Sequence, residues 1–595
     1  PDGFGFLIPD AGGEDLFLSP KQMLQLMHGD RALVRESGRD RKGRPEGKVI
    51  EVLERGMKAV SGQFHHEGRI GFLTPQNRRL TQDIVIPPGD EGDAKPGDFV
   101  TAEIVEYPTR RTQALGRITE VLGSDLNPAI HTELAIRNFG LPHVWGDAVH
   151  DEISGYGKDV PAGQKKGRYD IRHLPLVTID GEDARDFDDA VYCEATEKGW
   201  RLLVAIADVS AYVKTGTALD EEAYERGTST YFPNRVVPML PEVLSNGLCS
   251  LNPEVDRLCM LGDMQISRKG KLGKVQFHEA LMRSHARLTY TKVADMLEGG
   301  DKKLRKQYES LLPHLEELHA LYRVLSKSRR RRGAIDFETT ETRFAFDKQG
   351  SVTEIVPVIR NSAHKLIEEC MITANIAAAR FLEKHKMPAL YRVHGGPDAD
   401  KLESLQLFLS DLGLTLGGEE KPQPKDYANL LLEAKSRPDA QVVQTVLLRS
   451  LKQAVYQPAN DGHFGLALQQ YAHFTSPIRR YPDLLVHRAI RHVLNGGKPK
   501  DYGYTPAAME KHGHHCSTTE RRADEASWDV NEALKCEYLR DHVEDEFDGV
   551  VAGVSSFGLF IDIADFGISG LIHVTALGHD YFHHDAVHHK LVGEH

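Results

Sequence analysis

The sequence lacks paired cysteines, long apolar runs and an excess of positive charge. Its six cysteines are scattered without a C-x-x-C pair, which argues against a zinc ribbon and against a disulfide framework. No stretch approaches the length of a membrane span. We therefore expect a monomeric cytoplasmic protein with no membrane partner. The chain begins with Pro1, without a Met or a signal peptide, which predicts trimming at the N-terminus.

The net charge of −13 over 595 residues argues at first against a nucleic-acid partner, because phosphate binding is driven by lysine and arginine. The basic residues are nevertheless clustered, at Arg110–Arg111, Lys165–Arg168, Arg329–Arg332 and Arg479–Arg480. For the run at Arg329–Arg332 the alternative is a solvated helix end. The length itself predicts about three to five domains.

The first 122 residues contain an internal repeat. Gly5–Pro9 recurs as Gly71–Pro75, and Gly47–Leu53 recurs as Gly116–Leu122. Short strands separated by glycine turns at this spacing predict a pair of small β-barrels. A third set of such strands, from Gly549 to His573, predicts an incomplete barrel at the C-terminal end.

Aromatic residues alternate with small ones in the first copy of the repeat. Phe4 and Phe6 fall on one face of the same strand, and Phe17 follows in the next strand. Such rings can stack on the bases of a single-stranded nucleic acid, although core packing is the simpler alternative. These motifs resemble the RNA-binding motifs of cold-shock domains. The second copy has one aromatic residue, Phe72, where the first has three.

Residues 177–191 place six carboxylates within ten positions between two short apolar runs. The apolar runs predict strand ends, so the carboxylates lie where the chain leaves and re-enters a sheet. Asp186 and Asp188 alternate and can face one cavity, with Asp180 entering from the preceding strand and Asp189 joining by a turn or bulge. Crowded carboxylates favour a hard divalent cation. The alternative is a solvated acidic loop; the spacing does not fit an EF-hand.

A second informative stretch is residues 471–484, YAHFTSPIRRYPDL. Ser476 followed by Pro477 predicts the start of a helix. Arg479 and Arg480 then fall in its first turn, where positive charge opposes the helix dipole unless an anion lies between them. The alternative is an ordinary ion pair with Asp483.

These features, in this order, resemble the bacterial ribonuclease II and ribonuclease R family of 3′→5′ exoribonucleases. The resemblance covers nearly the whole chain, and residues 183–191 favour the ribonuclease R branch. The family's lysine-rich tail and N-terminal extension are absent, which predicts trimming at both ends. The resemblance implies a multidomain, mixed fold in which OB-fold β-barrel domains flank a central α+β catalytic domain. The expected domains are a first cold-shock barrel with a truncated start (1–55), a second (56–122), a linker with one short helix (123–175), the catalytic domain (176–545) and an incomplete RNA-binding barrel (546–595).

The resemblance also implies roles for individual residues. Asp180, Asp186, Asp188 and Asp189 would hold one or two Mg²⁺ ions, and Asp188 and Arg479 would be catalytic. Expected contacts with RNA come from Tyr231, Tyr290, Phe337, Glu368, Glu369, Arg480, Phe4, Phe6 and Phe17. The implied activity is processive release of 5′-mononucleotides from single-stranded 3′ ends, with structured RNA also accepted. The alternatives are a non-catalytic OB-fold RNA chaperone and a phosphodiesterase acting on DNA or small nucleotides.

Overall fold

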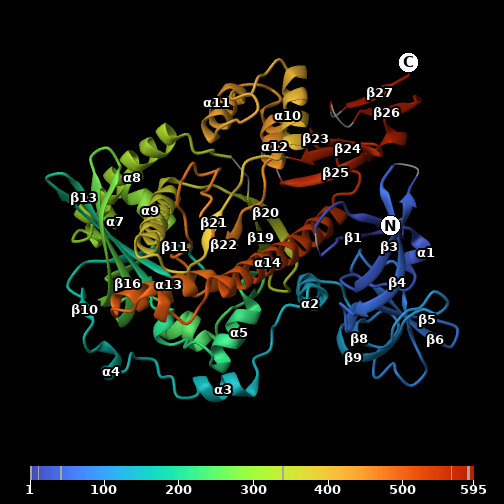
Figure 1. Cartoon of the computed structure of the whole chain (residues 1–595), viewed down its shortest axis with the longest axis horizontal. Coiled ribbons are helices and arrows are strands. Elements are labelled where there is room, and N and C mark those ends of the chain that lie inside the picture. Colours follow the sequence, from blue (N-terminus) through green and yellow to red (C-terminus); the bar gives the residue numbers. More distant parts are fainter. Residues whose placement is uncertain are drawn as a thin grey trace.

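The computed structural model describes residues 3–10, 12–40, 43–337, 341–563, 566–585, 588 and 590–594, so Pro1 lies outside the described part. Figure 1 shows a large central body of sheet and helices, with small β domains from the N-terminal (blue) and C-terminal (red) ends on one side of it. This arrangement confirms the predicted fold class, in which β domains flank a mixed catalytic domain.

The N-terminal repeat forms two sheets with matching strand orders, β1-β2-β4-β3 and β6-β7-β9-β8. In the second sheet, β5 pairs with both β6 and β8 and closes a barrel. No described strand takes the place of β5 in the first sheet, so the described part of the first repeat is an open four-stranded sheet. The predicted form of this repeat is a barrel with a truncated start. The elements are β1 (Gly5–Leu7), β2 (Leu16–Leu18), α1 (Pro20–Met23), β3 (Arg31–Arg39), β4 (Pro45–Glu54), β5 (Ala59–Glu67), β6 (Ile70–Pro75), β7 (Ile84–Ile86), β8 (Phe99–Glu106) and β9 (Leu115–Gly123).

A seven-stranded sheet of order β10-β17-β16-β13-β12-β11-β18 forms the centre of the molecule. Its central strands, β12, β13 and β16, are largely buried on both faces. In β12, for example, Val191 and Cys193 face one core while Ala190 and Tyr192 face the other. This explains why these strands are apolar almost throughout. The strands are β10 (Tyr169–Asp170), β11 (Val177–Asp180), β12 (Asp189–Thr196), β13 (Gly199–Ala207), β16 (Asp256–Ser267), β17 (Leu272–Arg283) and β18 (Ala286–Thr289).

Helices cover both faces of this sheet. The first core lies under α6 (Tyr290–Ala294), α8 (Leu312–Arg332) and α9 (Ser362–Lys384). The second lies under α5 (Ala218–Arg226), a π-helical segment at Val243–Leu248 and α14 (Pro506–Arg540). Helix α13 (Tyr481–Leu494) contributes to both cores, through Val486, Ala489 and Ile490 on one side and Leu484 and Leu485 on the other.

The segment 123–175 is more ordered than a linker. It contains α2 (Pro128–Asn138), α3 (Asp147–Ile153) and α4 (Ala162–Lys165), and it ends in β10 of the main sheet. Val149, Val160 and Ile171 are buried in the second core. These three residues are too widely spaced in the sequence to give a periodic pattern, yet all of them pack in this core.

The remaining elements form smaller units. Helices α10 (Ala399–Asp411), α11 (Pro424–Ala434) and α12 (Ala440–Ser450) share a core of their own. Near the C-terminal end, β23-β24-β25 form one sheet and β26 and β27 a hairpin. No helix among the described residues is both long and apolar enough to cross a membrane. The other elements are β14 (Thr230–Tyr231), β15 (Val236–Val237), α7 (Lys302–Gln307), β19 (Glu341–Phe346), β20 (Val352–Val358), β21 (Tyr391–Val393), β22 (Val455–Gln457), β23 (Val550–Ser555), β24 (Gly558–Ile563), β25 (Ile568–His573), β26 (Phe582–Asp585) and β27 (Lys590–Gly593).

Candidate active site

The acidic stretch forms the rim of a large cavity. Strand β11 ends at Asp180 and β12 begins at Asp189, so the loop between them lies at one edge of the central sheet. The cavity has a volume of about 1440 Å³ and is lined by Asp180, Asp186, Asp188, Asp189, Tyr231, Tyr290, Glu368, Arg479 and Arg480, among others. The structure thus brings together most of the site residues predicted from the sequence.

Two side chains from outside the acidic loop fix its course. The Ser250 hydroxyl accepts a hydrogen bond from the Phe187 N–H (3.0 Å) and donates one to the Arg185 carbonyl (2.7 Å). The Arg287 guanidinium donates to the Gly181 carbonyl (3.0 Å) and to the carbonyl of the next residue. The Phe187 ring is buried in the second core. Because the Phe187 ring points into this core, the side chains of Asp186 and Asp188 on either side of it face the cavity.

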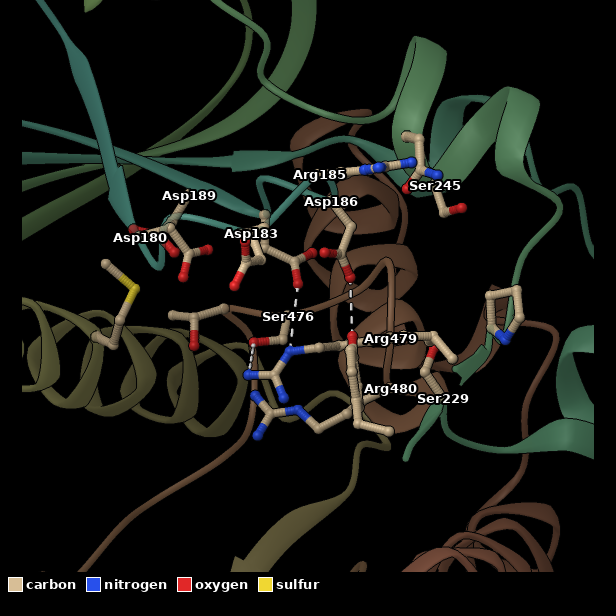
Figure 2. A pocket seen from close by; sticks show the side chains of 18 of the residues that line it. Asp180, Asp183, Arg185, Asp186, Asp189, Ser229, Ser245, Ser476, Arg479 and Arg480 are labelled. Carbon is tan, nitrogen blue, oxygen red and sulfur yellow. Dashed lines mark hydrogen bonds and ion pairs between the residues drawn. The ribbon is translucent and has the colours of Figure 1, made fainter. Parts of the chain in front are cut away.

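Asp188 is the most enclosed of the four aspartates. Its Oδ1 accepts the Ile478 N–H at 2.9 Å, and its Oδ2 lies 3.6 Å from Nε of Arg479. Burial raises the pKa of Asp188 well above its ordinary value and the charge of Asp186 adds to this, while Arg479 and the Ile478 N–H oppose it. The Asp188 carboxylate therefore joins the acidic loop to the segment that carries Arg479. Figure 2 shows Asp180, Asp186 and Asp189 on the side of the cavity that faces Arg479.

Burial disfavours the charged forms of Asp180 and Asp189 as well. Burial raises the pKa of both, and the charge of Asp180 helps to raise the pKa of Asp189 to about 7. One carboxylate oxygen of Asp189, Oδ2, is buried and has no hydrogen-bond partner among the described residues. A buried oxygen without a donor and carboxylates that repel one another fit a hard cation, because a cation satisfies the first and screens the second.

The side chains are not yet arranged as a complete ligand set. In the described part of the chain, no group of three or more His, Cys, Asp or Glu residues is placed to hold a metal ion as it stands. Asp186 accepts a hydrogen bond from the Tyr231 hydroxyl (2.8 Å), and Asp180 accepts one from the Gly181 N–H (2.7 Å). Protein donors thus occupy oxygens that a cation would take, and small rotations of these side chains would release them.

The two arginines differ in position and availability, and the predicted helix start is wrong. Helix α13 begins at Tyr481, and Pro477 lies in a turn before it, so neither arginine is in the first helical turn. Arg480 is bound to Asp483 (2.8 Å), as the alternative predicted, and its backbone pairs with Thr228. Arg479 is 44% exposed at its side chain and remains available to a ligand.

The aromatic and acidic residues predicted to contact RNA divide into two groups. Tyr231 and Tyr290 line the large cavity, and the Tyr290 ring stacks on His364 with centroids 3.9 Å apart. Glu368 also lines it, held by Arg329 and Arg360 at 2.6 Å each. Glu369 and Phe337 instead line a neighbouring cavity of about 230 Å³. Phe337, which was expected to contact RNA, therefore does not line the large cavity with Tyr231.

Phe4, Phe6 and Phe17 form a separate cluster on the first N-terminal sheet. Their ring centroids are 5.5 to 5.9 Å apart, and the Arg44 guanidinium lies 4.3 Å from the Phe17 centroid. Phe4 and Phe6 are 40% and 49% exposed, which favours a surface role over the core-packing alternative. None of the three lines the large cavity.

Several residues that line the cavity were not predicted from the sequence. Ser476 accepts a hydrogen bond from the Arg479 guanidinium (3.1 Å), and Arg360 holds Glu368. His473 lines the cavity beside Tyr456, whose hydroxyl is 2.8 Å from its Nδ1, and burial with nearby arginines keeps its pKa well below the ordinary value. Ser476 and His473 lie in the motif that contains Arg479, so their proximity was a usable signal, whereas nothing in the sequence marked Arg360.

Comparisons with known proteins identify the family and the fold. The RNB domain family matches residues 168–496, the cold shock domain family matches 72–146 and the ribonuclease B OB domain family matches 1–52. The chain therefore belongs to the RNB family of ribonucleases. Its activity is that of a 3′→5′ exoribonuclease.

Within this family the chain is similar to ribonuclease R. It is 52% identical to ribonuclease R of Vibrio cholerae over 606 aligned positions, which cover 100% of this chain and 74% of that protein. The apo form of Mycoplasma genitalium RNase R has a TM-score of 0.92 at 26% identity, covering 99% of this chain and 94% of that one. The same enzyme in complex with ribose-methylated single-stranded RNA has a TM-score of 0.91 at 25% identity, covering 99% and 95%.

Proposed function

We propose that this ribonuclease hydrolyses single-stranded RNA in the large cavity, one nucleotide at a time from the 3′ end, and releases 5′-mononucleotides. The observation that carries the proposal is the set of four aspartates that face Arg479 across one cavity. The complex of a similar enzyme with single-stranded RNA supports RNA as the ligand. Action on structured RNA, a monomeric state and a cytoplasmic location remain predictions; the six free cysteines are compatible with the last.

Asp180, Asp186, Asp188 and Asp189 would hold Mg²⁺, as one or two ions. Carboxylate oxygens are the ligands that Mg²⁺ prefers. Burial, with a smaller contribution from neighbouring carboxylates, raises the pKa values of Asp180, Asp188 and Asp189, and a bound cation would favour their charged forms. When bound, the ion lowers the pKa of a water molecule and neutralises charge on the phosphate.

The protein's own side chains position the scissile phosphate. In hydrolysis, a bond forms between the water oxygen and phosphorus, the bond from phosphorus to the upstream O3′ breaks, and the upstream RNA gains a 3′-hydroxyl. Arg479 lies opposite the aspartates and would stabilise the charge that develops on the phosphate oxygens. Tyr231 offers a ring for stacking, and Tyr290 and Glu368 offer polar groups for the ribose.

The test is the variant Asp188→Asn with 5′-labelled RNA, in Mg²⁺ or in chelator. We expect release of mononucleotides to be abolished while RNA binding stays nearly unchanged, because the amide keeps the shape but not the charge. A matched DNA oligomer tests the preference for RNA. Turnover equal to that of the unmodified protein would exclude the metal site proposed above, and binding by the unmodified protein without any turnover would favour the chaperone alternative.

A further inference from the structure

Five arginine side chains line the large cavity, and four of them lie within 4 Å of an acidic group, although Arg479 keeps an exposed side chain. Arg235 is paired with Glu133, Arg360 with Glu368, Arg480 with Asp483 and Arg479 with Asp188. Arg185 is exposed, and its side chain makes no ion pair or hydrogen bond with any described residue. The cavity therefore contains one guanidinium whose charge and five donors are uncommitted.

The unpaired state of Arg185 is a product of the loop, because acidic neighbours are close in sequence. Asp183 and Asp186 lie two and one positions away, and a mobile loop would let either pair with it. The Ser250 hydroxyl instead donates to the Arg185 carbonyl at 2.7 Å and accepts from the Phe187 N–H at 3.0 Å. These two hydrogen bonds fix the backbone from Arg185 to Phe187. Figure 2 shows the Arg185 side chain directed away from the carboxylates and toward Ser245.

The wall that Arg185 approaches is polar. Ser245 and Asn246 line the same cavity and belong to the π-helical segment Val243–Leu248. Irregular helical turns of this kind are frequent at functional sites. The Asn246 side chain has no hydrogen-bond partner among the described residues, and the Ser245 hydroxyl makes one long bond of 3.3 Å to the Pro241 carbonyl. The Arg185 guanidinium and the Asn246 side-chain amide thus offer donors that no described residue uses.

We propose that Arg185 forms a phosphate subsite in this cavity, beyond the aspartates that would hold the metal. A planar guanidinium binds two phosphate oxygens at once, and a cavity rich in carboxylates needs such a cation to accept a polyanion. The phosphate belongs either to the bound RNA chain or to the released 5′-mononucleotide, since both present the same oxygens. This inference rests on the proposed function, because it takes a nucleotide as the occupant of the cavity.

The first test measures RNA binding in chelator, where turnover does not interfere. Arg185→Gln is compared with Arg235→Gln, a matched control that lines the same cavity but is already paired with Glu133. If Arg185 contacts the RNA chain, affinity falls about tenfold and the slope of log affinity against log salt becomes shallower by about 0.7, the value for one phosphate contact on a single strand. Arg185→Lys, which keeps the charge, should recover part of the loss. Arg235→Gln should leave the slope unchanged.

The second test identifies the source of the phosphate. Inhibition of the Mg²⁺-dependent reaction by 5′-AMP is compared with inhibition by adenosine, which lacks the phosphate. If the subsite holds the released nucleotide, Arg185→Gln weakens inhibition by 5′-AMP about tenfold and leaves that by adenosine unchanged. If neither the salt slope nor inhibition by 5′-AMP changes in a folded Arg185→Gln protein, the subsite is excluded. Failure of the proposed function would appear separately, as absence of mononucleotide release by the unmodified chain.

Discussion

At the scale of single residues, the site is built from groups that the fold alone does not favour. Asp180, Asp188 and Asp189 have raised pKa values because burial disfavours their charged forms. Carboxylates with such raised pKa values are typical of functional sites, where a bound ligand stabilises their charged forms. The stability of the metal-free protein should therefore report on these aspartates independently of activity.

The first prediction concerns the pH dependence of stability in chelator. The pKa of Asp189 is about 7 in the folded protein and about 3.9 when unfolded, so between these values the folded state binds the extra proton. Its contribution to the free energy of unfolding then falls as pH rises, by up to about 1.4 kcal/mol per unit, and levels off above pH 7. We expect Asp189→Asn to show a smaller fall, measured by denaturant unfolding from pH 5 to 8. Parallel curves for the two proteins would contradict this.

The second prediction separates the ring of Tyr231 from its hydroxyl. Tyr231→Ala removes a stacking surface, so we expect the shortest RNA fragment left undegraded to become longer. Tyr231→Phe keeps the ring but removes the hydrogen bond to Asp186, and it should keep the end product of the unmodified protein. Fragment lengths are read on a sequencing gel. An unchanged end product in Tyr231→Ala would place the stacking surface elsewhere.

At the scale of elements, the acidic loop depends on a residue that lies 63 positions from it in sequence, Ser250. The third prediction is that Ser250→Ala lowers kcat at least about tenfold while RNA binding in chelator stays close to normal. The variant leaves the buried Phe187 N–H without a partner, which costs about 1–3 kcal/mol, and frees the loop that carries Asp186 and Asp188.

A control for this variant is Ser450→Ala. Ser450 is also a buried serine, but its hydroxyl bonds to the Leu447 carbonyl within α12, outside the large cavity. We expect it to lower stability without a specific loss of kcat. Equal losses of kcat in the two variants would mean that the Ser250 effect is general destabilisation.

The sequence was sufficient to predict the acidic turn between β11 and β12, because apolar strands flanked it. It did not predict the start of α13. Ser476 and Pro477 have the residue types of a helix start, but the turn before Tyr481 is stabilised by the Asp188 carboxylate, which accepts the Ile478 N–H. This local conformation depends on a contact between segments that are distant in sequence, so a local sequence pattern cannot predict it. For Arg480 the sequence left two possibilities open, an anion site and an ion pair with Asp483, and the structure shows the ion pair.

At the scale of the whole molecule, the aromatic cluster lies on a different domain from the cavity. The fourth prediction is that replacing Phe4, Phe6 and Phe17 together by Ala weakens binding of long RNA, by about 1–3 kcal/mol for each base that is stacked. Hydrolysis of an oligomer too short to reach the N-terminal sheet should be unchanged. Binding is measured by fluorescence anisotropy, with Phe72→Ala as the control in the second copy of the repeat. Equal losses on short and long RNA would indicate misfolding.

The domain arrangement was predictable because repeats and motif order survive in the sequence, whereas the packing of residues 123–175 was not. Few apolar residues in that segment lie at regular spacing, and their burial depends on surfaces supplied by the rest of the chain. The four strands of the first sheet match those of the closed barrel in order and pairing, as the internal repeat predicted.

The hydrogen bond between Ile478 and Asp188 also bears on the order in which the parts of the site are synthesised. During synthesis, the N-terminal sheets and the acidic loop leave the ribosome well before Ile478 and Arg479, because 290 positions separate the two partners of this hydrogen bond. A nascent chain that has not yet reached Ile478 therefore carries the aspartates of the proposed site without the arginine that faces them.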